Sequence, residues 1–357
     1  MLHALTIVRI QTLTEHCTAF HLQVPEHLKE IFQYLPGQHL TFEETIDGIR
    51  LRRNYSICSG PADPYLTIAV KQVPGGIFTG FIHDQWKPGR TVHTLKPMGR
   101  FVLPPAAGDQ TRHFIALVGG SGITPVMAML RHGLVQDPRL HFTIFYSNST
   151  VRDIAFREEL DGLKNNYPDR LSLHHVLTGE LLDNPLFSGR IDGWKLAQWN
   201  RHLVDFTHAD GLFLCGPGNL MQLSRDTLLE LGVASAKIHQ EWFSPPQAVK
   251  SGTVQPTASP TDCLHATIEV IRDGQHLQIP VEHSLQTILD AAEAAEIDLP
   301  YSCRGGVCAT CKTRLLQGEI KMQTNYALEP DELEAGYILA CQAIPQTREI
   351  TISYDGD

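Results

Sequence analysis

The sequence contains no long hydrophobic run: stretches such as residues 114–118 are far shorter than the roughly 20 apolar residues of a membrane-spanning helix. It also lacks an excess of positive charge. Its 39 Asp and Glu outnumber 29 Lys and Arg, whereas a nucleic-acid-binding surface needs many cations to neutralise phosphates. The N-terminus lacks the basic segment and unbroken apolar core of a secretory signal. We therefore expect a soluble, cytoplasmic protein that binds neither membranes nor nucleic acid.

Cysteine is scarce as well: the 357 residues include eight, too few for a scaffold held by disulfides. Four of them fall in one region, since Cys303, Cys308 and Cys311 lie within nine residues and Cys341 follows. In a cytosolic chain such clustering indicates a metal site rather than disulfides. The composition, 42% hydrophobic and 19% charged, is otherwise that of a globular protein of two or three domains.

Prolines and small polar residues interrupt the hydrophobic patterning at residues 244–262, which we interpret as a linker. The region after it carries 15 Asp and Glu against 6 Lys and Arg, so most of the net charge of −10 belongs to the last module. An acidic surface suits steering onto a basic patch of a partner, and it equally serves solubility. We place the domains at 1–105, 106–243 and 263–357.

The three domains show different hydrophobic periodicities. In the first, several runs alternate between apolar and polar residues, which predicts an antiparallel β-barrel. In the second, short apolar strands alternate with helical patterns, which predicts an α/β domain with a parallel sheet. In the third, Asp273-Gly274 predicts a hairpin turn, followed by a helix with Ser284 as N-cap. The third domain is therefore expected to have an α+β, β-grasp-like fold.

The spacing Cys303-x4-Cys308-x2-Cys311, with Cys341 after 29 further residues, is that of plant-type 2Fe-2S ferredoxins. Soft thiolate ligands suit iron. The two glycines of the CRGGVC segment let the backbone wrap closely and turn N–H groups toward the sulfurs. A structural zinc site is the alternative, but its ligands usually arrive as two short-spaced pairs. The sequence therefore predicts a 2Fe-2S cluster held by the four cysteines.

The segment GGSGITP, 119–125, follows an apolar strand and precedes a helical pattern. Glycines at such a turn let a phosphate approach the backbone, and the helix N-terminus supplies free N–H groups. The third glycine of the Rossmann fingerprint is missing, so a tight turn without a ligand is the alternative. A second glycine-rich segment, CGPG at 215–218, also ends a strand. Both should line one crevice, because ligands lie beyond the carboxyl ends of parallel strands.

The end of the next strand, YSNST, carries no Asp or Glu for a ribose diol. This absence favours a phosphorylated ribose and hence NADPH, with NADH as the alternative. Ser149 and Arg152 are candidate partners of that phosphate, although Arg152 fits a solvated surface equally well.

RNYSI, 53–57, ends a predicted strand, and VPGGIFTGF follows some 20 residues later. This arrangement resembles the ferredoxin-NADP reductase superfamily, in which RxYS binds flavin and a glycine turn opening a helix binds its phosphate. That resemblance covers the first 243 residues, and a resemblance to plant-type ferredoxins covers the last module. Together they imply FAD, NAD(P)H and a 2Fe-2S cluster as cofactors.

The resemblance assigns roles by position. Arg53 offers a forked charge-assisted bond to phosphate, Tyr55 an aromatic face, and Ser56 a hydroxyl near flavin N5. Cys215 is expected near the reactive nicotinamide carbon and Glu241 to assist protons, which makes Ser56, Cys215 and Glu241 the catalytic candidates. The other cofactor-binding candidates are Gly120, Ser121, Gly122, Thr124 and Gly216 for the nucleotide, and Gly76, Thr79 and Phe243 for the flavin.

The segment EWF, 241–243, has two interpretations. By the resemblance, Phe243 covers the flavin ring and Glu241 lies close to it. The alternatives are a core Phe and a surface Glu without a role at the cofactor.

The module order and the segments around the cysteines resemble the reductase components of multicomponent monooxygenases and epoxidases. The resemblance implies an enzyme that takes a hydride from NAD(P)H and passes single electrons through flavin and cluster to an oxygenase component, with a di-iron centre in the epoxidases. The alternatives are a reductase of a Rieske-type steroid or aromatic hydroxylase, and a ferredoxin-like carrier with a non-catalytic docking half. At Ser149 the sequence departs from the arginine expected to grip a 2′-phosphate, which weakens the case for NADPH.

Overall fold

The computed structural model describes residues 2–106, 108–243, 266–282 and 285–355. The chain separates into two compact units, Met1–Phe243 and Ser244–Asp357. Within the described ranges, every helix is too short or too polar to span a membrane. The expected linker lies outside the described residues, and the expected boundary at 105/106 falls inside the first unit.

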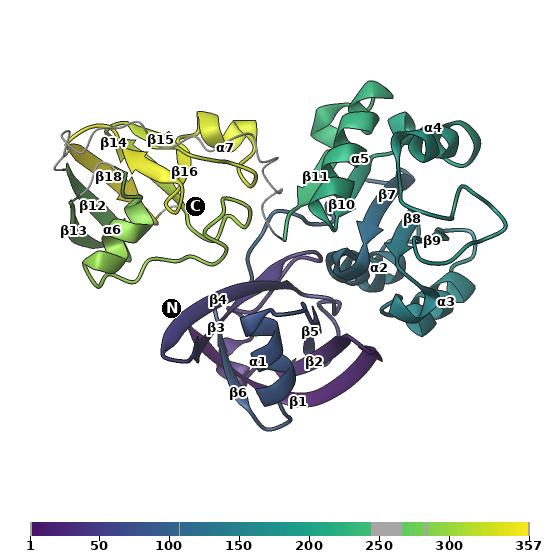
Figure 1. The fold of residues 1–357 in the computed structure, drawn as a ribbon, viewed down its shortest axis with the longest axis horizontal. Helices are drawn as coiled ribbons and strands as arrows, with labels where there is room; N and C mark the ends of the chain where they lie inside the picture. The colour runs from purple at the N-terminus through teal and green to yellow at the C-terminus, as the bar shows by residue number, and fades with distance from the viewer. Residues whose placement is uncertain (1, 107, 244–265, 283–284, 356–357) are drawn as a thin grey trace. The chain divides into compact units, whose positions relative to one another are not determined.

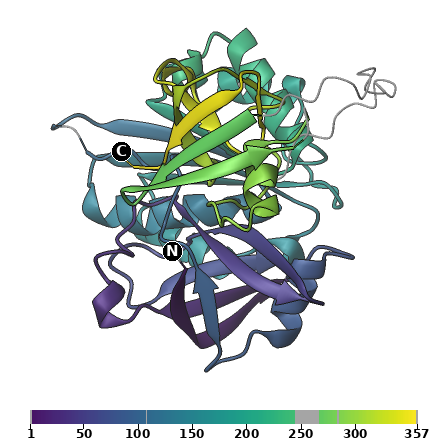
Figure 2. The same ribbon diagram turned by 90° about the vertical axis from the view of Figure 1, so that its left-hand side faces the viewer.

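The first part of unit 1 is an antiparallel barrel with the strand order β4-β3-β6-β1-β2-β5, and Figures 1 and 2 show its strands crossing around a common core. The ring closes where Ile57 pairs with Ile68, one residue beyond the end of β4. The RNYS segment therefore lies at the seam of the barrel. Its strands are β1 (His3–Thr14), β2 (Cys17–Gln23), β3 (His39–Ile46), β4 (Ile49–Ser56), β5 (Leu66–Lys71) and β6 (Thr91–Thr94).

Helix α1 (Ile77–Gln85) begins directly after Gly75-Gly76, as the sequence predicts. It buries Phe78 and Ile82 in the barrel core. At its C-terminal end, the buried ring of Trp86 meets Phe20 edge to face, with centroids 5.3 Å apart. Because the helix is anchored by these apolar contacts, its N-terminal turn is held in a fixed place on the barrel.

The second part of unit 1 is a five-stranded parallel sheet in the order β11-β10-β7-β8-β9. Helices α2 and α3 cover one face, where Leu160 joins Phe142 in the core, and α4 and α5 cover the other (Figure 1). On that second face, Trp199 stacks on Phe145 at 4.1 Å and 14°. The elements are β7 (Arg112–Gly119), α2 (Ile123–Gln136), β8 (Leu140–Asn148), α3 (Arg157–Asn166), β9 (Leu171–Leu177), α4 (Gly193–His202), β10 (Gly211–Cys215), α5 (Gly218–Glu230) and β11 (Ile238–Glu241).

Helix α4 is an element that the sequence patterning did not predict. Its N-cap is Asp192, whose carboxylate accepts a 2.8 Å hydrogen bond from the Lys195 N–H. An Asp directly before a helical pattern is a signal for a helix start, and Asp192 supplies this signal in the sequence. Short 3-10 turns complete unit 1: η1 (Glu26–Leu28), η2 (Gly120–Gly122), η3 (Val151–Asp153), η4 (Phe206–His208) and η5 (Ser235–Lys237).

The second unit is an α+β fold of the β-grasp type, with a mixed sheet in the order β13-β12-β18-β14-β16, seen in green and yellow in Figure 2. The predicted hairpin is confirmed: Arg272 pairs with Gln275, and both turn residues, Asp273 and Gly274, have positive φ (51° and 71°). A type I′ turn requires that conformation. The strands are β12 (Ala266–Arg272), β13 (Gln275–Val281), β14 (Lys312–Gln317), β15 (Ile320–Met322), β16 (Tyr337–Leu339), β17 (Ala343–Pro345) and β18 (Glu349–Ser353), and the helices are α6 (Ile288–Ala294) and α7 (Pro330–Glu334).

Helix α6 starts later than its sequence pattern suggests. The residue that caps it is Thr287, whose hydroxyl accepts from the Asp290 N–H at 3.2 Å. Ser284, the expected N-cap, lies outside the described residues. The helix packs its buried side chains, Ile288 among them, against the sheet that leads to the cysteine loop.

Candidate functional site

The flavin candidates Arg53 and Tyr55 lie on one face of β4, because side chains two residues apart along a strand point the same way. The Arg53 guanidinium is exposed and donates to the carbonyl of the preceding residue at 2.7 Å. The Tyr55 ring is half-buried and stacks on Phe78 of α1, with centroids 6.2 Å apart and 29° between the planes. Burial raises the pKa of the Tyr55 hydroxyl, which therefore stays protonated. The pair presents a cation and an aromatic surface side by side.

Ser56 lies on the opposite face of β4 and connects the barrel to the parallel sheet. Its hydroxyl donates to Oε2 of Glu241 at 2.9 Å, across 185 positions of sequence. Ser56 is buried, and the Glu241 side chain is only 12% exposed, so the alternative of a surface Glu is wrong. Phe243 is 42% exposed, so the alternative of a core Phe is wrong as well. Both residues are thus left available for a role at the flavin edge.

The first turn of α1 has the features of a phosphate-binding helix start. Gly76 is the N-cap, and no side chain caps the turn. A Cβ on Gly76 would lie 2.6 Å from Thr79 Oγ1, so this position needs glycine. The Thr79 hydroxyl accepts from the Val73 N–H (3.2 Å) and donates to the Gly76 carbonyl (3.3 Å), and thereby shapes the turn. Backbone N–H groups are left for an anion such as a flavin phosphate.

The two glycine-rich strand ends meet, as the sequence predicts. Strands β7 and β10 are parallel neighbours with Val118 opposite Cys215. A Cβ on Gly122 would lie 2.1 Å from the carbonyl oxygen of Cys215, and a Cβ on Gly216 would lie 2.9 Å from the Gly119 nitrogen. Glycine is therefore required on both sides of this contact. The result is a bare backbone surface at the carboxyl edge of the sheet.

Two side-chain hydroxyl groups donate hydrogen bonds to backbone carbonyls of the nucleotide loop. Tyr146 donates to the Gly120 carbonyl at 3.1 Å, and Thr124 donates to the Ser121 carbonyl at 2.9 Å. No side chain caps the N-terminus of α2, which follows this loop, or of α5, which follows CGPG. The N-terminus of α3 has no side-chain cap either. Sequence reasoning missed Lys71 at the end of β5, whose ammonium would lie 3.7 Å from a Cβ on Gly120. The positive charge of Lys71 therefore lies beside the loop that a bound pyrophosphate would contact.

Cys215 is fully buried, and burial together with the charge of Glu241 raises the pKa of its thiol well above the ordinary value. The thiol is therefore neutral, and a neutral thiol is a poor nucleophile.

Ser149 and Arg152 are both exposed just beyond the end of β8. The Ser149 carbonyl accepts from the Gly179 N–H at 2.7 Å, which fixes the backbone of this exposed residue. The acidic residue in this turn, Asp153, accepts from both the N–H (3.0 Å) and the hydroxyl (2.9 Å) of Thr150 in a capping box. One oxygen of its carboxylate, Oδ2, is thus engaged locally.

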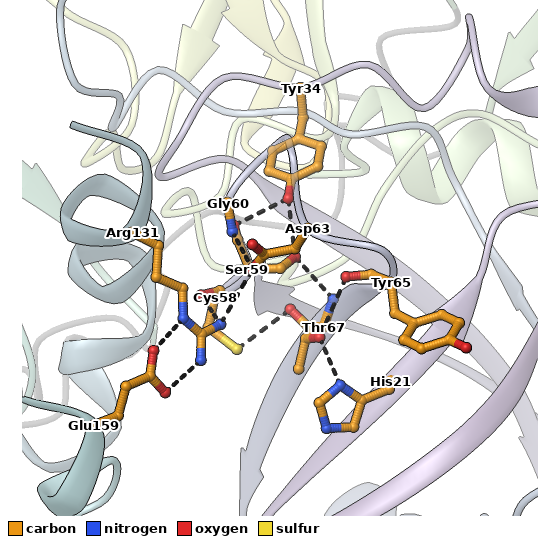
Figure 3. A network of polar contacts seen from close by, with 10 residues as sticks. All are labelled: His21, Tyr34, Cys58, Ser59, Gly60, Asp63, Tyr65, Thr67, Arg131 and Glu159. Carbon is orange, nitrogen blue, oxygen red and sulfur yellow. Dashed lines mark hydrogen bonds and ion pairs between the residues drawn. The ribbon is translucent and has the colours of Figure 1, made fainter. Parts of the chain in front are cut away.

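A polar network joins the end of the flavin strand to the nucleotide-loop helix (Figure 3). Arg131 of α2 donates to the Cys58 carbonyl (2.5 Å) and forms a two-pronged ion pair with Glu159 of α3 (2.5 and 2.6 Å). On the barrel side, the Ser59 hydroxyl accepts from the Thr67 N–H at 3.0 Å. No sequence signal marked Arg131, because its partners are distant in the chain.

The four predicted cluster ligands come together as two pairs. The thiols of Cys303 and Cys308 influence each other's pKa, and so do those of Cys311 and Cys341. The pKa of Cys303 is lowered: the largest cause is the neighbouring Cys308 thiol, burial opposes it, and backbone N–H groups such as that of Gly305 lower it further. Across the described residues, no three His, Cys, Asp or Glu side chains converge as around a single ion. Two pairs of thiols suit two irons better than one tetrahedral zinc.

The loop that carries these cysteines forms a cradle of N–H donors. The Gly305 N–H donates to Cys303 Sγ at 3.3 Å. Gly306 has φ +73°, and a Cβ there would lie 3.0 Å from Thr324 Oγ1. Gln342, missed by the sequence analysis, donates to the Arg304 carbonyl at 2.9 Å and accepts from the Thr324 hydroxyl at 2.8 Å. A side-chain clamp next to Cys341 therefore fixes the loop, and the donor set fits an iron-sulfur cluster.

Three family models match the chain in succession. The first is described as "Oxidoreductase FAD-binding domain" and matches residues 4–103, and the second, "Oxidoreductase NAD-binding domain", matches 116–226. The third, "2Fe-2S iron-sulfur cluster binding domain", matches 270–346. Their order is the order of modules that the sequence predicts.

Two curated proteins and one solved structure extend the similarity over the whole chain. The chain is 39% identical to one of the subunits of the 1,2-phenylacetyl-CoA epoxidase of Escherichia coli (strain K12), over 99% of this chain and 98% of that protein. It is 32% identical to the 3-ketosteroid-9-alpha-monooxygenase ferredoxin reductase component of Mycobacterium tuberculosis, over 93% and 88%. Phthalate dioxygenase reductase shares the fold, with TM-score 0.58 and 24% identity over 99% of this chain and 98% of that one.

Proposed function

The chain belongs to the family of FAD- and 2Fe-2S-containing reductase components of multicomponent oxygenases, and we propose that its electron acceptor is the oxygenase component of a phenylacetyl-CoA epoxidase. As a member of this family it is an NAD(P)H-dependent oxidoreductase. The single observation that carries the acceptor is the 39% identity to the E. coli epoxidase protein over nearly the full length of both chains. The sequence segments around the cysteines predict the same class of acceptor.

The bound flavin supplies the conversion between a two-electron hydride and the one-electron chemistry of the cluster. The chain's own residues provide binding and orientation. Arg53 and the uncapped turn at Gly76 hold phosphate charge, and Tyr55 offers a flat surface beside them. The Ser56 hydroxyl, fixed by Glu241, holds a proton at the end of the same strand, on its opposite face. Cysteines 303, 308, 311 and 341 hold the cluster in a cradle of N–H donors that favours added negative charge.

The proposed nucleotide is NADPH, with NADH as the alternative. Support comes from the exposed Ser149 and Arg152 beyond β8, and from the capping box that engages the carboxylate of Asp153. Lys71 adds a charge near the loop that would hold the pyrophosphate. A location in the cytoplasm belongs to the same proposal, since the reducing cytosol keeps cluster thiols reduced.

The first experiment is anaerobic stopped-flow reduction of the purified protein by NADPH and, separately, by NADH, with full visible spectra. We expect flavin bleaching followed by cluster bleaching, and faster with NADPH. Flavin bleaching without cluster bleaching would contradict the relay, and a faster reaction with NADH would contradict the nucleotide assignment.

A second candidate acceptor is favoured by the 32% identity to the 3-ketosteroid-9-alpha-monooxygenase reductase component. Side-by-side turnover with the epoxidase oxygenase and with the steroid monooxygenase oxygenase separates the two. We expect product only with the epoxidase component, at saturating NADPH and equal concentrations of each oxygenase. Comparable coupled turnover with the steroid enzyme would overturn the proposed acceptor while leaving the reductase chemistry intact.

A further inference from the structure

A line of polar side chains runs along one face of β3 and β4 from the Ser56–Glu241 contact. In the antiparallel register, His39 lies opposite Ser56 and Thr41 lies opposite Asn54. His39 is 5% exposed and Thr41 is 1% exposed, so each of these polar groups has been removed from water. Buried polar groups in folded proteins are hydrogen-bonded, because an unpaired one costs free energy.

The amide of Asn54 fixes which nitrogen of His39 carries the proton. The Thr41 hydroxyl donates to Asn54 Oδ1 at 2.8 Å, so the amide nitrogen is the group that faces His39 Nε2, at 3.2 Å. An amide nitrogen only donates, and therefore His39 Nε2 must accept and carry no proton. A neutral imidazole has one N–H, which places the proton of His39 on Nδ1.

The protonated nitrogen faces the carboxylate of Glu241. Nδ1 lies 3.6 Å from Oε1, while the Ser56 hydroxyl donates to the other oxygen, Oε2, at 2.9 Å. Gly99 packs against this side of the ring, where any larger residue would crowd His39, since a Cβ at that position would lie 2.9 Å from Nδ1. Backbone bonds between His39 and Met98 (2.8 and 3.0 Å) hold the strand in register there.

From this geometry we propose that His39 is a positioning residue: its Nδ1–H, set by Asn54, holds Glu241 in the orientation in which the carboxylate accepts the Ser56 hydroxyl. With a donor directed at each oxygen, the carboxylate has one preferred rotamer, and the Ser56 proton has one defined direction. Besides Glu241, the charged groups on this face of β3 and β4 are the Arg52–Glu43 ion pair (2.6 Å) and, beyond it, Arg50. The proposal deepens the proposed function, because it concerns the same flavin-side pair.

The first test reads the tautomer without turnover. In protein labelled with 15N at histidine, the His39 signals, identified by their loss in His39→Gln, should show a protonated Nδ1 and an unprotonated Nε2. Asn54→Asp keeps the size of the side chain but replaces the donor by an acceptor, so Nε2 should become protonated. A wild-type ring protonated at Nε2, or an unchanged signal in Asn54→Asp, would overturn the assignment.

The second test uses two amides that each mimic one ring nitrogen. His39→Asn places an N–H near the position of Nδ1, whereas His39→Gln places its amide near Nε2. We expect hydride transfer to fall about tenfold in His39→Gln and to stay within about threefold of wild type in His39→Asn, because small misplacements at a reacting centre cost large factors in rate. The exposed His202 at the end of α4, changed to Asn and to Gln, is the matched control.

Equal rates in wild type and both His39 variants, or an equal loss in both, would refute the positioning role. If a His39 variant fails to fold, Asn54→Asp supplies the same comparison through the tautomer and the hydride-transfer rate. The NMR result stands whether or not the proposed oxygenase accepts electrons, so failure of the acceptor proposal and failure of this one remain distinguishable.

Discussion

Arg131 donates a 2.5 Å hydrogen bond to the backbone carbonyl of Cys58. Arg131 is on α2, the helix that begins at the nucleotide loop, and Cys58 is two residues after Ser56 at the seam of the barrel. Glu159 of α3 holds the guanidinium in place with two further bonds (Figure 3). This one side chain therefore connects the helix after the expected nucleotide loop to the strand end that carries the expected flavin residues.

Replacing Arg131 by Met should lower the free energy of unfolding of unit 1 by about 2–3 kcal/mol, because a buried carbonyl and a carboxylate lose a charged donor. It should also slow hydride transfer about tenfold while bound FAD is retained. Urea unfolding followed by tryptophan fluorescence checks the first effect, since all four tryptophans lie in unit 1.

The control for that variant is Arg139→Met, which removes an ion pair with Asp109 whose partners are 44% and 93% exposed. Such surface pairs contribute little, so the unfolding free energy should change by less than about 0.5 kcal/mol. Equal effects of the two substitutions would show that Arg131 has no special role.

Gly122→Ala should disrupt the nucleotide loop, since the added Cβ would lie 2.1 Å from the Cys215 carbonyl oxygen. We expect a loss of about 1–3 kcal/mol in stability and a raised KM for the nucleotide. The comparison is Gly162→Ala within α3, where a Cβ meets nothing within 4 Å. There the substitution should stabilise unit 1 by about 0.5–1 kcal/mol. Thermal unfolding measures the change in stability of both variants, and steady-state kinetics measure the change in KM for the nucleotide.

Cys311→Ser should abolish the cluster and leave the flavin half active. The expected signature is loss of the cluster's visible absorption and electron paramagnetic resonance signal, with NADPH-dependent reduction of ferricyanide retained. Cys17→Ala is the control: burial raises the pKa of the Cys17 thiol to about 11, and we expect its removal to leave the cluster content unchanged. An intact cluster in Cys311→Ser would contradict the ligand assignment.

The stability of unit 1 should fall as the pH drops below about 6.5, in part because of His174. Burial first, and then the charges of Lys164 and His175, lower the pKa of His174 in the folded protein. The unfolded chain therefore takes up a proton on His174 at a higher pH than the folded protein does. The contribution of neutral His174 to the free energy of unfolding is complete above the pKa of the unfolded chain, and it is lost as the pH falls toward the pKa of the folded protein.

His174→Phe should flatten that dependence and keep the stack in which the ring lies between Phe145 (5.0 Å) and Phe187 (5.4 Å). The measurement is the urea midpoint of the tryptophan transition at about pH 7.5 and about pH 5. An unchanged difference between the two midpoints would show that His174 does not contribute.

Much of the architecture was accessible from local signals. The hairpin at Asp273-Gly274 and the contact between the two glycine segments follow from turn chemistry and from the rule that parallel strands end at one edge. The cysteine spacing likewise placed the four thiols together. These features each depend on residues that are close in sequence, or on a general property of sheets.

The supporting side chains were not accessible in the same way. His39 meets Glu241 and Arg131 meets Cys58 only after the barrel and the parallel sheet have come together, and neither residue type is unusual at its position. Lys71 is the last residue of β5, and the hydrophobic pattern of that strand does not predict which loop lies beside it. Such contacts are a property of tertiary packing, which a single sequence does not display.

Strand β11 (Ile238–Glu241) has a consequence for the order in which the molecule is assembled on the ribosome. It covers the edge of β10 and brings Glu241 to Ser56, so unit 1 is complete only when its last few residues have been made. Cys341 follows 98 residues after Phe243, and this stretch takes roughly 5 to 20 s to synthesise. The flavin half therefore has time to fold before Cys341 emerges, and a site with all four cluster ligands exists only after unit 1 has been made.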